Sequence, residues 1–224
     1  MIFNLNILLP EIFLTISILL ILMIGVFIKK SFNLIFNFSS LILIVTFVII
    51  FNNGFSTENV FSNSFVRDPF SNFFKLLILT SSLFILNSSK TFIIDQKIDK
   101  FEYPIIILIS ILGMFFMVSS NDLILFYLGL ELQSLALYIL AAIDRDNLRS
   151  SESGIKYFIL SALSSGLLLY GCSLLYGFTG STNFEIILNQ LDKTNNGAIF
   201  AMVFILVGLA FKISAVPFHM WAPD

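Results

Sequence analysis

Seven apolar segments, each close to the length that crosses a lipid bilayer, are the feature that most constrains this chain. A transmembrane helix needs about 20 mainly apolar residues to cross roughly 30 Å of hydrocarbon. The segments that meet this requirement are Leu8–Ile28, Phe32–Phe51, Phe70–Ser88, Tyr103–Ser119, Leu123–Ile143, Tyr157–Phe178 and Ala198–Trp221. We therefore predict an all-α polytopic membrane protein with about seven transmembrane helices.

The composition supports this class and excludes others. Hydrophobic residues make up 58% of the 224 residues and charged residues 12%, whereas soluble domains contain about 25% charged residues. The net charge of −2 gives no indication of a nucleic acid partner. The single cysteine, Cys172, has no second cysteine for a disulfide or a thiolate metal site. We expect it to be a small packing residue.

The basic residues of the connecting segments predict the orientation, because such residues are retained on the inner side of a membrane. Two basic residues lie in loops on one side, Arg67 and Lys193. Eight lie in the loops after the first, third and fifth spans, namely Lys29, Lys30, Lys90, Lys97, Lys100, Arg145, Arg149 and Lys156. We therefore expect the N-terminus to face the periplasm or the intermembrane space.

Charged residues near the outer ends of spans have structural interpretations. Glu11 follows Pro10 in the first turn of a helix, where a carboxylate meets the positive end of the helix dipole. Asp68 precedes Pro69 and is predicted to cap the third span. Lys75 lies about two turns further on and can extend back to the surface. We favour these interpretations over a functional Glu11 or a buried Lys75.

Two other patterns predict packing. Small residues at helical spacing in the sixth span, Ser161, Ala162, Ser165 and Gly166, predict a close helix contact and no chemistry. The segment Ser181–Asn196 has apolar residues at helical spacing. We expect it to form a short amphipathic helix on the outer surface.

Three ionisable residues lie inside the predicted spans or at their edge. Glu131 lies nine residues into the fifth span, at a depth of about 14 Å for a rise of about 1.5 Å per residue. Lys212 lies near the middle of the seventh span and Lys156 at the inner start of the sixth. A charge at the centre of a membrane helix costs about 2.5–3.5 kcal/mol on insertion scales. We therefore expect these side chains to face the protein interior and to function there.

Glu131 belongs to a polar stripe. Tyr127, Glu131, Ser134 and Tyr138 share one face of a helix because they are three or four residues apart. Such a stripe either lines a hydrated path or holds helices together. The carboxylate favours the path, since hydroxyl groups suffice for helix contact.

Lys212 precedes a predicted helix break. Pro217 cannot donate a hydrogen bond to the carbonyl of Ile213, so the helix should end or kink just after the lysine. His219 lies seven residues after Lys212 and on nearly the same face. These residues fit two alternatives equally well. One is a proton switch, in which a carboxylate partner approaches Lys212 and withdraws; the other is a static ion pair that orients two helices.

Three segments resemble one family. These are FYLGLELQSLALYIL (Phe126–Leu140), ESGIKYFILSALSSGLLLYG (Glu152–Gly171) and GLAFKISAVPFHMWAPD (Gly208–Asp224). They resemble spans five, six and seven of the antiporter-like membrane subunits of respiratory complex I, the NADH–ubiquinone oxidoreductase. The sequences around Glu131 and Lys212 are most similar to those of the chain 2 family, whose bacterial members are called subunit N.

The resemblance implies a fold and a function. The fold is the first half of an antiporter-like inverted repeat with a broken seventh helix. It consists of a three-helix N-terminal region (1–100) and an antiporter-like core repeat (101–224). The implied function is proton translocation coupled to quinone reduction, with Glu131 and Lys212 as a charge pair. Lys156 would connect that pair to a central relay, and His219 matches a family position of less defined role.

The resemblance also implies partners. NADH, FMN, iron–sulfur clusters and ubiquinone would bind other subunits of the complex, and this chain would hold no cofactor. Family members have about fourteen spans, whereas this sequence stops after seven, so we expect a separate chain or a missing portion to supply the second half. The expected location is the mitochondrial inner membrane, with a bacterial plasma membrane as the alternative. A subunit of a stand-alone cation/proton antiporter is the alternative function.

Overall fold

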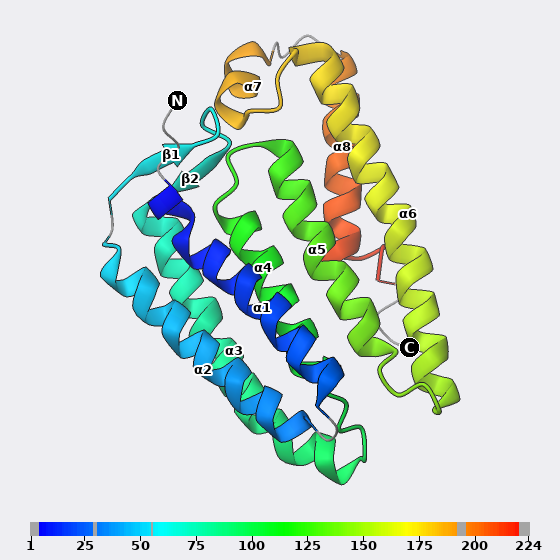
Figure 1. Ribbon diagram of the computed structural model, residues 1–224. Coiled ribbons are helices and arrows are strands. Elements are labelled where there is room, and N and C mark those ends of the chain that lie inside the picture. Colours follow the sequence, from blue (N-terminus) through cyan, green and yellow to red (C-terminus); the bar gives the residue numbers. More distant parts are fainter. Residues whose placement is uncertain (1–4, 29–30, 55, 192–195, 220–224) are drawn as a thin grey trace.

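The computed structural model describes residues 5–28, 31–54, 56–191 and 196–219 of the chain. The elements, in chain order, are η1 (Leu5–Leu8), α1 (Leu9–Phe27), α2 (Phe32–Asn52), β1 (Glu58–Val60), β2 (Phe65–Arg67), α3 (Pro69–Asp95), α4 (Glu102–Val118), α5 (Leu123–Ala141), α6 (Leu148–Thr179), α7 (Phe184–Gln190) and α8 (Asn196–Lys212). The seven long helices form an elongated bundle, with the hairpin and α7 at the opposite end from the α3–α4 and α5–α6 connections (Figure 1).

The seven predicted spans correspond to these seven helices. Five of them, α1, α2, α3, α5 and α6, are long and apolar enough to cross a membrane, and α4 and α8 are shorter apolar helices of 17 residues each. An all-α membrane protein is therefore confirmed. Lys29, Lys30, Lys193 and residues 220–224, which entered the orientation, the last span and the family motif, lie outside the described residues.

Two helices extend well beyond the predicted spans. The helix α3 continues from Ser88 to Asp95, and α6 begins at Leu148 instead of Tyr157. The Asn147 side chain caps α6 by accepting a hydrogen bond from the backbone N–H of Arg149. Hydropathy locates only the part of a helix that lies in hydrocarbon, so polar turns that continue outside it were missed.

The start of α3 has the predicted cap. The Asp68 carboxylate accepts a hydrogen bond from the Ser71 backbone N–H at 2.7 Å, and the Ser71 hydroxyl accepts one from the Asp68 N–H at 2.9 Å. This reciprocal arrangement satisfies two backbone donors that a helix start otherwise leaves unpaired.

A small antiparallel hairpin lies at the same end of the bundle as α7 (Figure 1). Its two strands, β1 and β2, pair Glu58 with Arg67 and Val60 with Phe65. The hairpin also joins the α4–α5 connection, because the N–H of Val66 donates to the carbonyl of Ser119 at 2.9 Å. It therefore ties the segment that precedes α3 to the start of α5.

The amphipathic helix expected in Ser181–Asn196 is shorter than predicted. In the described part of this segment the helix α7 has seven residues. Ile187 is buried, whereas Leu188, which was expected on the same face, is 73% exposed. A helix of about two turns is therefore too short to bury the whole predicted face.

Three apolar clusters form the interior of the described residues, the smallest of which joins η1 to the hairpin through Ile7, Leu8, Val60 and Phe65. The first joins α1 to α4 and includes the fully buried Leu14, Ile35, Leu43, Leu79 and Phe115. The second joins α5, α6, α7 and α8 and includes Leu168, Cys172, Ile187 and Ala201. Cys172 is buried in this second cluster, which confirms its predicted packing role.

The helices α4 and α5 pack with their backbones in contact. A Cβ atom on Gly113 would lie 2.6 Å from the backbone nitrogen of Gln133, and one on Gly129 would lie 2.7 Å from that of Met117. Only glycine leaves room for this approach, because the atoms that a side chain would meet belong to the neighbouring main chain.

The helices α6 and α8 approach each other in a similar way. A Cβ atom on Gly171 would lie 2.8 Å from the backbone nitrogen of Ile205, and one on Gly208 would lie 2.6 Å from Cβ of Leu168. A Cβ atom on Gly166, which the sequence placed at a close contact, would have no such neighbour within 4 Å. The contact predicted for the sixth span is therefore made by other glycines.

These contacts predict different effects of two alanine substitutions. Gly113→Ala should destabilise the fold by about 1–3 kcal/mol, the usual cost of overpacking. Gly166→Ala, the matched control, should be neutral or slightly stabilising, because alanine is the better helix former. Reaction of the single buried thiol, Cys172, with a fluorescent dye during heating reports unfolding. Equal midpoints for the two variants would contradict the close α4–α5 contact.

Candidate functional site

Lys212 is the last residue of α8, as its position before Pro217 predicted. The chain then leaves the helical path, with the Ala215 N–H donating to the Ala210 carbonyl at 2.9 Å. The Lys212 side chain is 9% exposed and points toward α5 and α6. The helix end therefore places one ammonium group inside the bundle.

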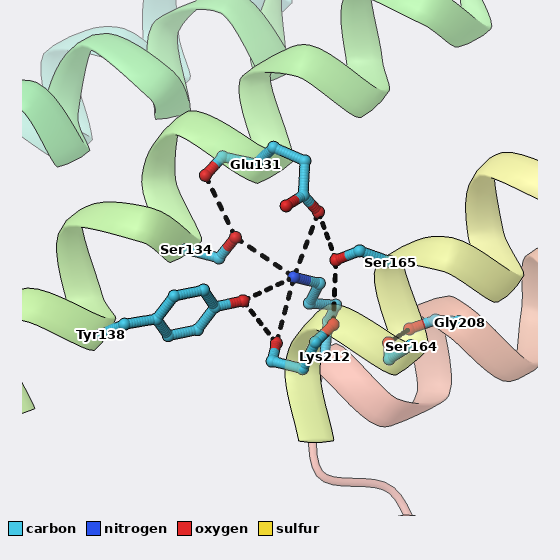
Figure 2. A network of polar contacts seen from close by, with 8 residues as sticks. Glu131, Ser134, Tyr138, Ser164, Ser165, Gly208 and Lys212 are labelled. Atoms are coloured by element: carbon cyan, nitrogen blue, oxygen red, sulfur yellow. Dashed lines mark hydrogen bonds and ion pairs between the residues drawn. The ribbon is translucent and has the colours of Figure 1, made fainter. Parts of the chain in front are cut away.

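Four side-chain oxygens surround this ammonium (Figure 2). Its Nζ lies 3.3 Å from Oε1 of Glu131, which forms an ion pair. It donates to the hydroxyls of Ser134 at 3.1 Å, Tyr138 at 3.0 Å and Ser161 at 3.2 Å. A lysine ammonium has three N–H donors, so these four acceptors share its full donor capacity.

Glu131 is held from two sides. Its Oε1 accepts a hydrogen bond of 2.5 Å from the hydroxyl of Ser165 on α6. Its backbone carbonyl accepts one of 3.1 Å from Ser134, the next residue of the stripe. The carboxylate side chain is 21% exposed, more than Lys212. The predicted stripe is therefore confirmed for Glu131, Ser134 and Tyr138, which all face Lys212.

Tyr138 connects the three helices. Its hydroxyl accepts from Lys212 and donates to the hydroxyl of Ser161 at 2.5 Å. The Lys212 Nζ lies 5.7 Å from the centroid of the Tyr138 ring, within the range of a cation–π contact. The ring of Tyr157 meets that of Tyr138 edge-on at 4.7 Å and fixes its orientation.

The hydroxyls of α6 correct the interpretation of the small residues of the sixth span. Ser161 and Ser165 were expected to serve packing alone, yet both bind the charge pair. Ser164, between them, donates to the carbonyl of Gly208 at 3.1 Å and joins α6 to α8. Two serines four residues apart on one helix face are the signal that would have indicated this role.

The arrangement has the chemistry of proton exchange. Transfer of a proton from the Lys212 ammonium to Glu131 Oε1 would break an N–H bond and form an O–H bond. The hydroxyls of Ser165, Ser161 and Tyr138 can each donate and accept, so they can pass protons onward. A low dielectric strengthens every interaction in such a network.

Two predicted relay residues lie elsewhere. Lys156 is 44% exposed on α6, and its ammonium lies 3.1 Å from Glu152 of the same helix. His219 is exposed in the segment after α8. The contacts described for these two residues do not join them to the Glu131–Lys212 pair, so their roles stay predictions.

Glu11 and Lys75 form a contact that the sequence did not predict. They form a second ion pair, with 2.6 Å between Lys75 Nζ and Glu11 Oε1, and each side chain is 2% exposed. Glu11 thus lies in the first turn of α1 as predicted, whereas the buried Lys75 contradicts the lysine that extends to solvent. The pair joins residues 64 positions apart, so no local pattern indicates it.

Comparison with known proteins gives one family. Residues 120–224, which include both members of the Glu131–Lys212 pair, match the family model described as "NADH:quinone oxidoreductase/Mrp antiporter, TM". Curated relatives named NADH-quinone oxidoreductase subunit N include one from Pelagibacter ubique, 56% identical over 99% of this chain and 47% of the relative. One from Parvibaculum lavamentivorans is 52% identical over 96% of this chain and 45% of the relative.

A solved structure agrees with this result. A chain of respiratory complex I from Thermus thermophilus with bound aureothin superimposes with a TM-score of 0.80 at 26% identity. The match covers 96% of the present chain and 46% of that chain. The present chain thus spans about half the length of the relatives it matches.

The site geometry predicts that Glu131 and Lys212 are energetically coupled. In a double-mutant cycle of Glu131→Gln and Lys212→Met, the double variant should lose less stability than the two single variants combined. We expect a coupling of about 1–2 kcal/mol, below the range of about 3–5 kcal/mol for breaking a fully buried pair.

The exposed pair Glu152–Lys156 supplies the matched control, since surface pairs contribute about 0–1 kcal/mol. Thermal unfolding of the purified chain measures both cycles. Additive losses at Glu131 and Lys212 would show that the observed contact contributes nothing to stability.

Proposed function

We propose that this chain helps move protons across a membrane. The reason is that it belongs to the family of antiporter-like membrane subunits that includes NADH-quinone oxidoreductase subunit N. The Glu131–Lys212 pair would carry this function. The observation that supports it most directly is the contact of Lys212 with one carboxylate and three hydroxyls inside the bundle. A purely structural anchor does not need a charge at this depth, because charges there are costly.

The proposed mechanism is electrostatic. A cation away from water is costly unless an anion lies close to it. A change in the distance between Glu131 and Lys212 therefore changes the free energy of holding a proton on the lysine. Movement of either helix would alternately load and unload the pair, with the neighbouring hydroxyls as donors and acceptors.

Two further residues are proposed members of the path. Lys156 would pass protons between the pair and a central relay, and its place on α6, the helix of Ser161 and Ser165, is compatible with that. His219 follows Lys212 in the segment after α8 and would act as a titratable group beside the helix end. Both proposals rest on the family resemblance of the surrounding residues.

The proposed assembly is the membrane part of an NADH-quinone oxidoreductase, in which quinone reduction is coupled to proton pumping. Other subunits of its membrane arm would be the partners. The remainder of the relatives' length, on a separate chain or a continuation of this one, would pack beside the helices α4 to α8. NADH, FMN, iron–sulfur clusters and ubiquinone would bind other subunits, and we propose that this chain binds no cofactor.

The proposed orientation follows from the basic loops. The α3–α4 and α5–α6 connections, which contain Lys100 and Arg145, lie at the same end of the bundle (Figure 1). We propose that this end faces the matrix or cytoplasm. The abundance of Phe, Ile and Asn, whose codons are rich in A and T, is typical of an A/T-rich genome and favours the mitochondrial inner membrane, whereas the compared relatives are bacterial. The mechanism is the same in either membrane.

Charge removal tests the function. Glu131→Ala and Lys212→Ala in the assembled complex should each lower proton uptake by inside-out vesicles about tenfold or more, an effect of at least about 1.4 kcal/mol. The reason is that either change leaves one member of the pair without its partner. Lys90→Ala, which removes a lysine on the exposed part of α3, is the matched control and should pump normally. Normal pumping by both site variants, with the complex assembled, would refute the relay.

Isolation from the membrane tests the assembly. The alternative, a stand-alone cation/proton antiporter, has support because the matched family model includes Mrp antiporters. Purified in mild detergent through a tag, this chain should bring with it an NADH-oxidising arm that reduces quinone. Isolation of the chain with antiporter subunits alone, in a preparation without NADH oxidation, would favour the alternative.

A further inference from the structure

The buried Glu11–Lys75 pair takes no part in the network around Lys212 and needs its own explanation. Its Nζ to Oε1 distance is 2.6 Å, compared with 3.3 Å for Glu131 and Lys212. Glu11 belongs to the first turn of α1 and Lys75 to the second turn of α3. The pair therefore joins two helices of the N-terminal region directly.

The surroundings of this pair are apolar. The Lys75 Nζ lies 5.1 Å from the ring centroid of Phe65 and 5.7 Å from that of Phe115. The second carboxylate oxygen of Glu11, Oε2, is buried without a hydrogen-bond partner among the described residues. No hydroxyl group is described as binding either charge, in contrast to the three hydroxyls that bind Lys212. A pair of this kind has no evident route for protons and is suited to fixing positions.

The two aromatic rings connect the pair to α5 by two routes. Phe115 belongs to α4, and it lies two residues from Gly113 and from Met117, where the backbones of α4 and α5 touch. Phe65 belongs to β2 and forms a bridge with Ser120, two residues before Asp122. Asp122 caps α5 by accepting from the Ile124 N–H at 2.8 Å.

The two routes thus meet α5 at its outer end and along the side that faces α4. Glu131 lies two residues after Gly129 on this helix, so its position follows that of the α4–α5 contact. A shift of Lys75 would move Phe115 and Phe65 and, through them, the carboxylate that pairs with Lys212.

We propose that Glu11 and Lys75 are positioning residues, which set the height and rotation of α5 and thereby the distance between Glu131 and Lys212. The inference rests on the proposed function of that second pair. Buried ion pairs add little net stability compared with apolar groups of the same size, so fixing a geometry is a reason to keep one. The contact between Glu11 and Lys75 thus serves to hold α1, α3 and α4 in a defined arrangement.

The test uses the complete membrane complex that contains this chain, in inside-out vesicles. The variants are Glu11→Gln, Lys75→Met, the two combined, and each of these in a Glu131→Gln background. Lys90→Met is the matched control, because Lys90 is on the same helix and lies 5.1 Å from the Phe36 ring, yet is near the surface. The readouts are the amount of assembled complex and the number of protons moved per electron pair.

The single variants should lower assembly, since each leaves an unpaired buried charge, and the combined variant should restore it. The combined variant should nevertheless move about threefold to tenfold fewer protons per electron pair, a typical size for indirect coupling. In the Glu131→Gln background the same combined change should have no further effect. A variant that only reduced the amount of assembled complex would leave the number of protons moved per electron pair unchanged.

Three results would overturn the proposal. They are a normal proton ratio in the combined variant, a loss of the same size in the Glu131→Gln background, and failure of the combined variant to assemble. The last result would make the pair a requirement for folding. Normal pumping by Glu131→Gln itself would instead refute the proposed function of Glu131 and Lys212, so the two failures are distinguishable.

Discussion

The ammonium of Lys212 needs anionic or dipolar partners wherever it lies inside a bilayer, and much of the fold provides them. One carboxylate and two hydroxyls come from α5, and another hydroxyl comes from α6. The four oxygens come from α5 and α6, and the ammonium lies at the end of α8. These three helices must therefore lie close together and be correctly rotated about their axes. The glycine contacts between α4 and α5 and between α6 and α8 meet the first requirement.

Much of this could be predicted from the sequence because its causes are local. Hydropathy located seven helices, the Asp68–Pro69 pair indicated the start of α3, and Pro217 indicated the end of α8 at Lys212. The face shared by Glu131, Ser134 and Tyr138 follows from helical spacing alone. Each of these predictions uses only residues of one helix and of its two ends.

Contacts with another helix could not be predicted from the residues alone, and the Glu131–Lys212 pair was expected only from the family resemblance. Ser161 and Ser165 look like packing residues until α5 and α8 are placed beside α6. The Glu11–Lys75 contact joins two helices whose relative placement the sequence does not reveal. The early start of α6 was missed for a different reason, since its first turns are polar and hydropathy does not detect them.

The two ion pairs show how one combination of residues serves different ends. Around Lys212 the neighbours are hydroxyls, which can exchange protons and reorient. Around Lys75 the neighbours are aromatic rings, which stabilise a cation without accepting its proton. The identity of the neighbours, more than the presence of a glutamate and a lysine, therefore distinguishes a candidate exchange site from a fixed contact.

The glycine contacts have a mechanical consequence. The closest backbone approaches pair α4 with α5 and α6 with α8 as two closely packed blocks, and Gly154 of α6 also meets Ala142 at the end of α5. Glu131 belongs to one block and Lys212 to the other, and the middle of the seam between the blocks is joined by polar side chains. Sliding of one block along the other would change the length of the ion pair, but it would also break the contacts at both ends of the seam, Ser150 with Ala141 and Thr182 with Leu123. The ion pair thus lies in the middle of a seam that is fastened at its two ends.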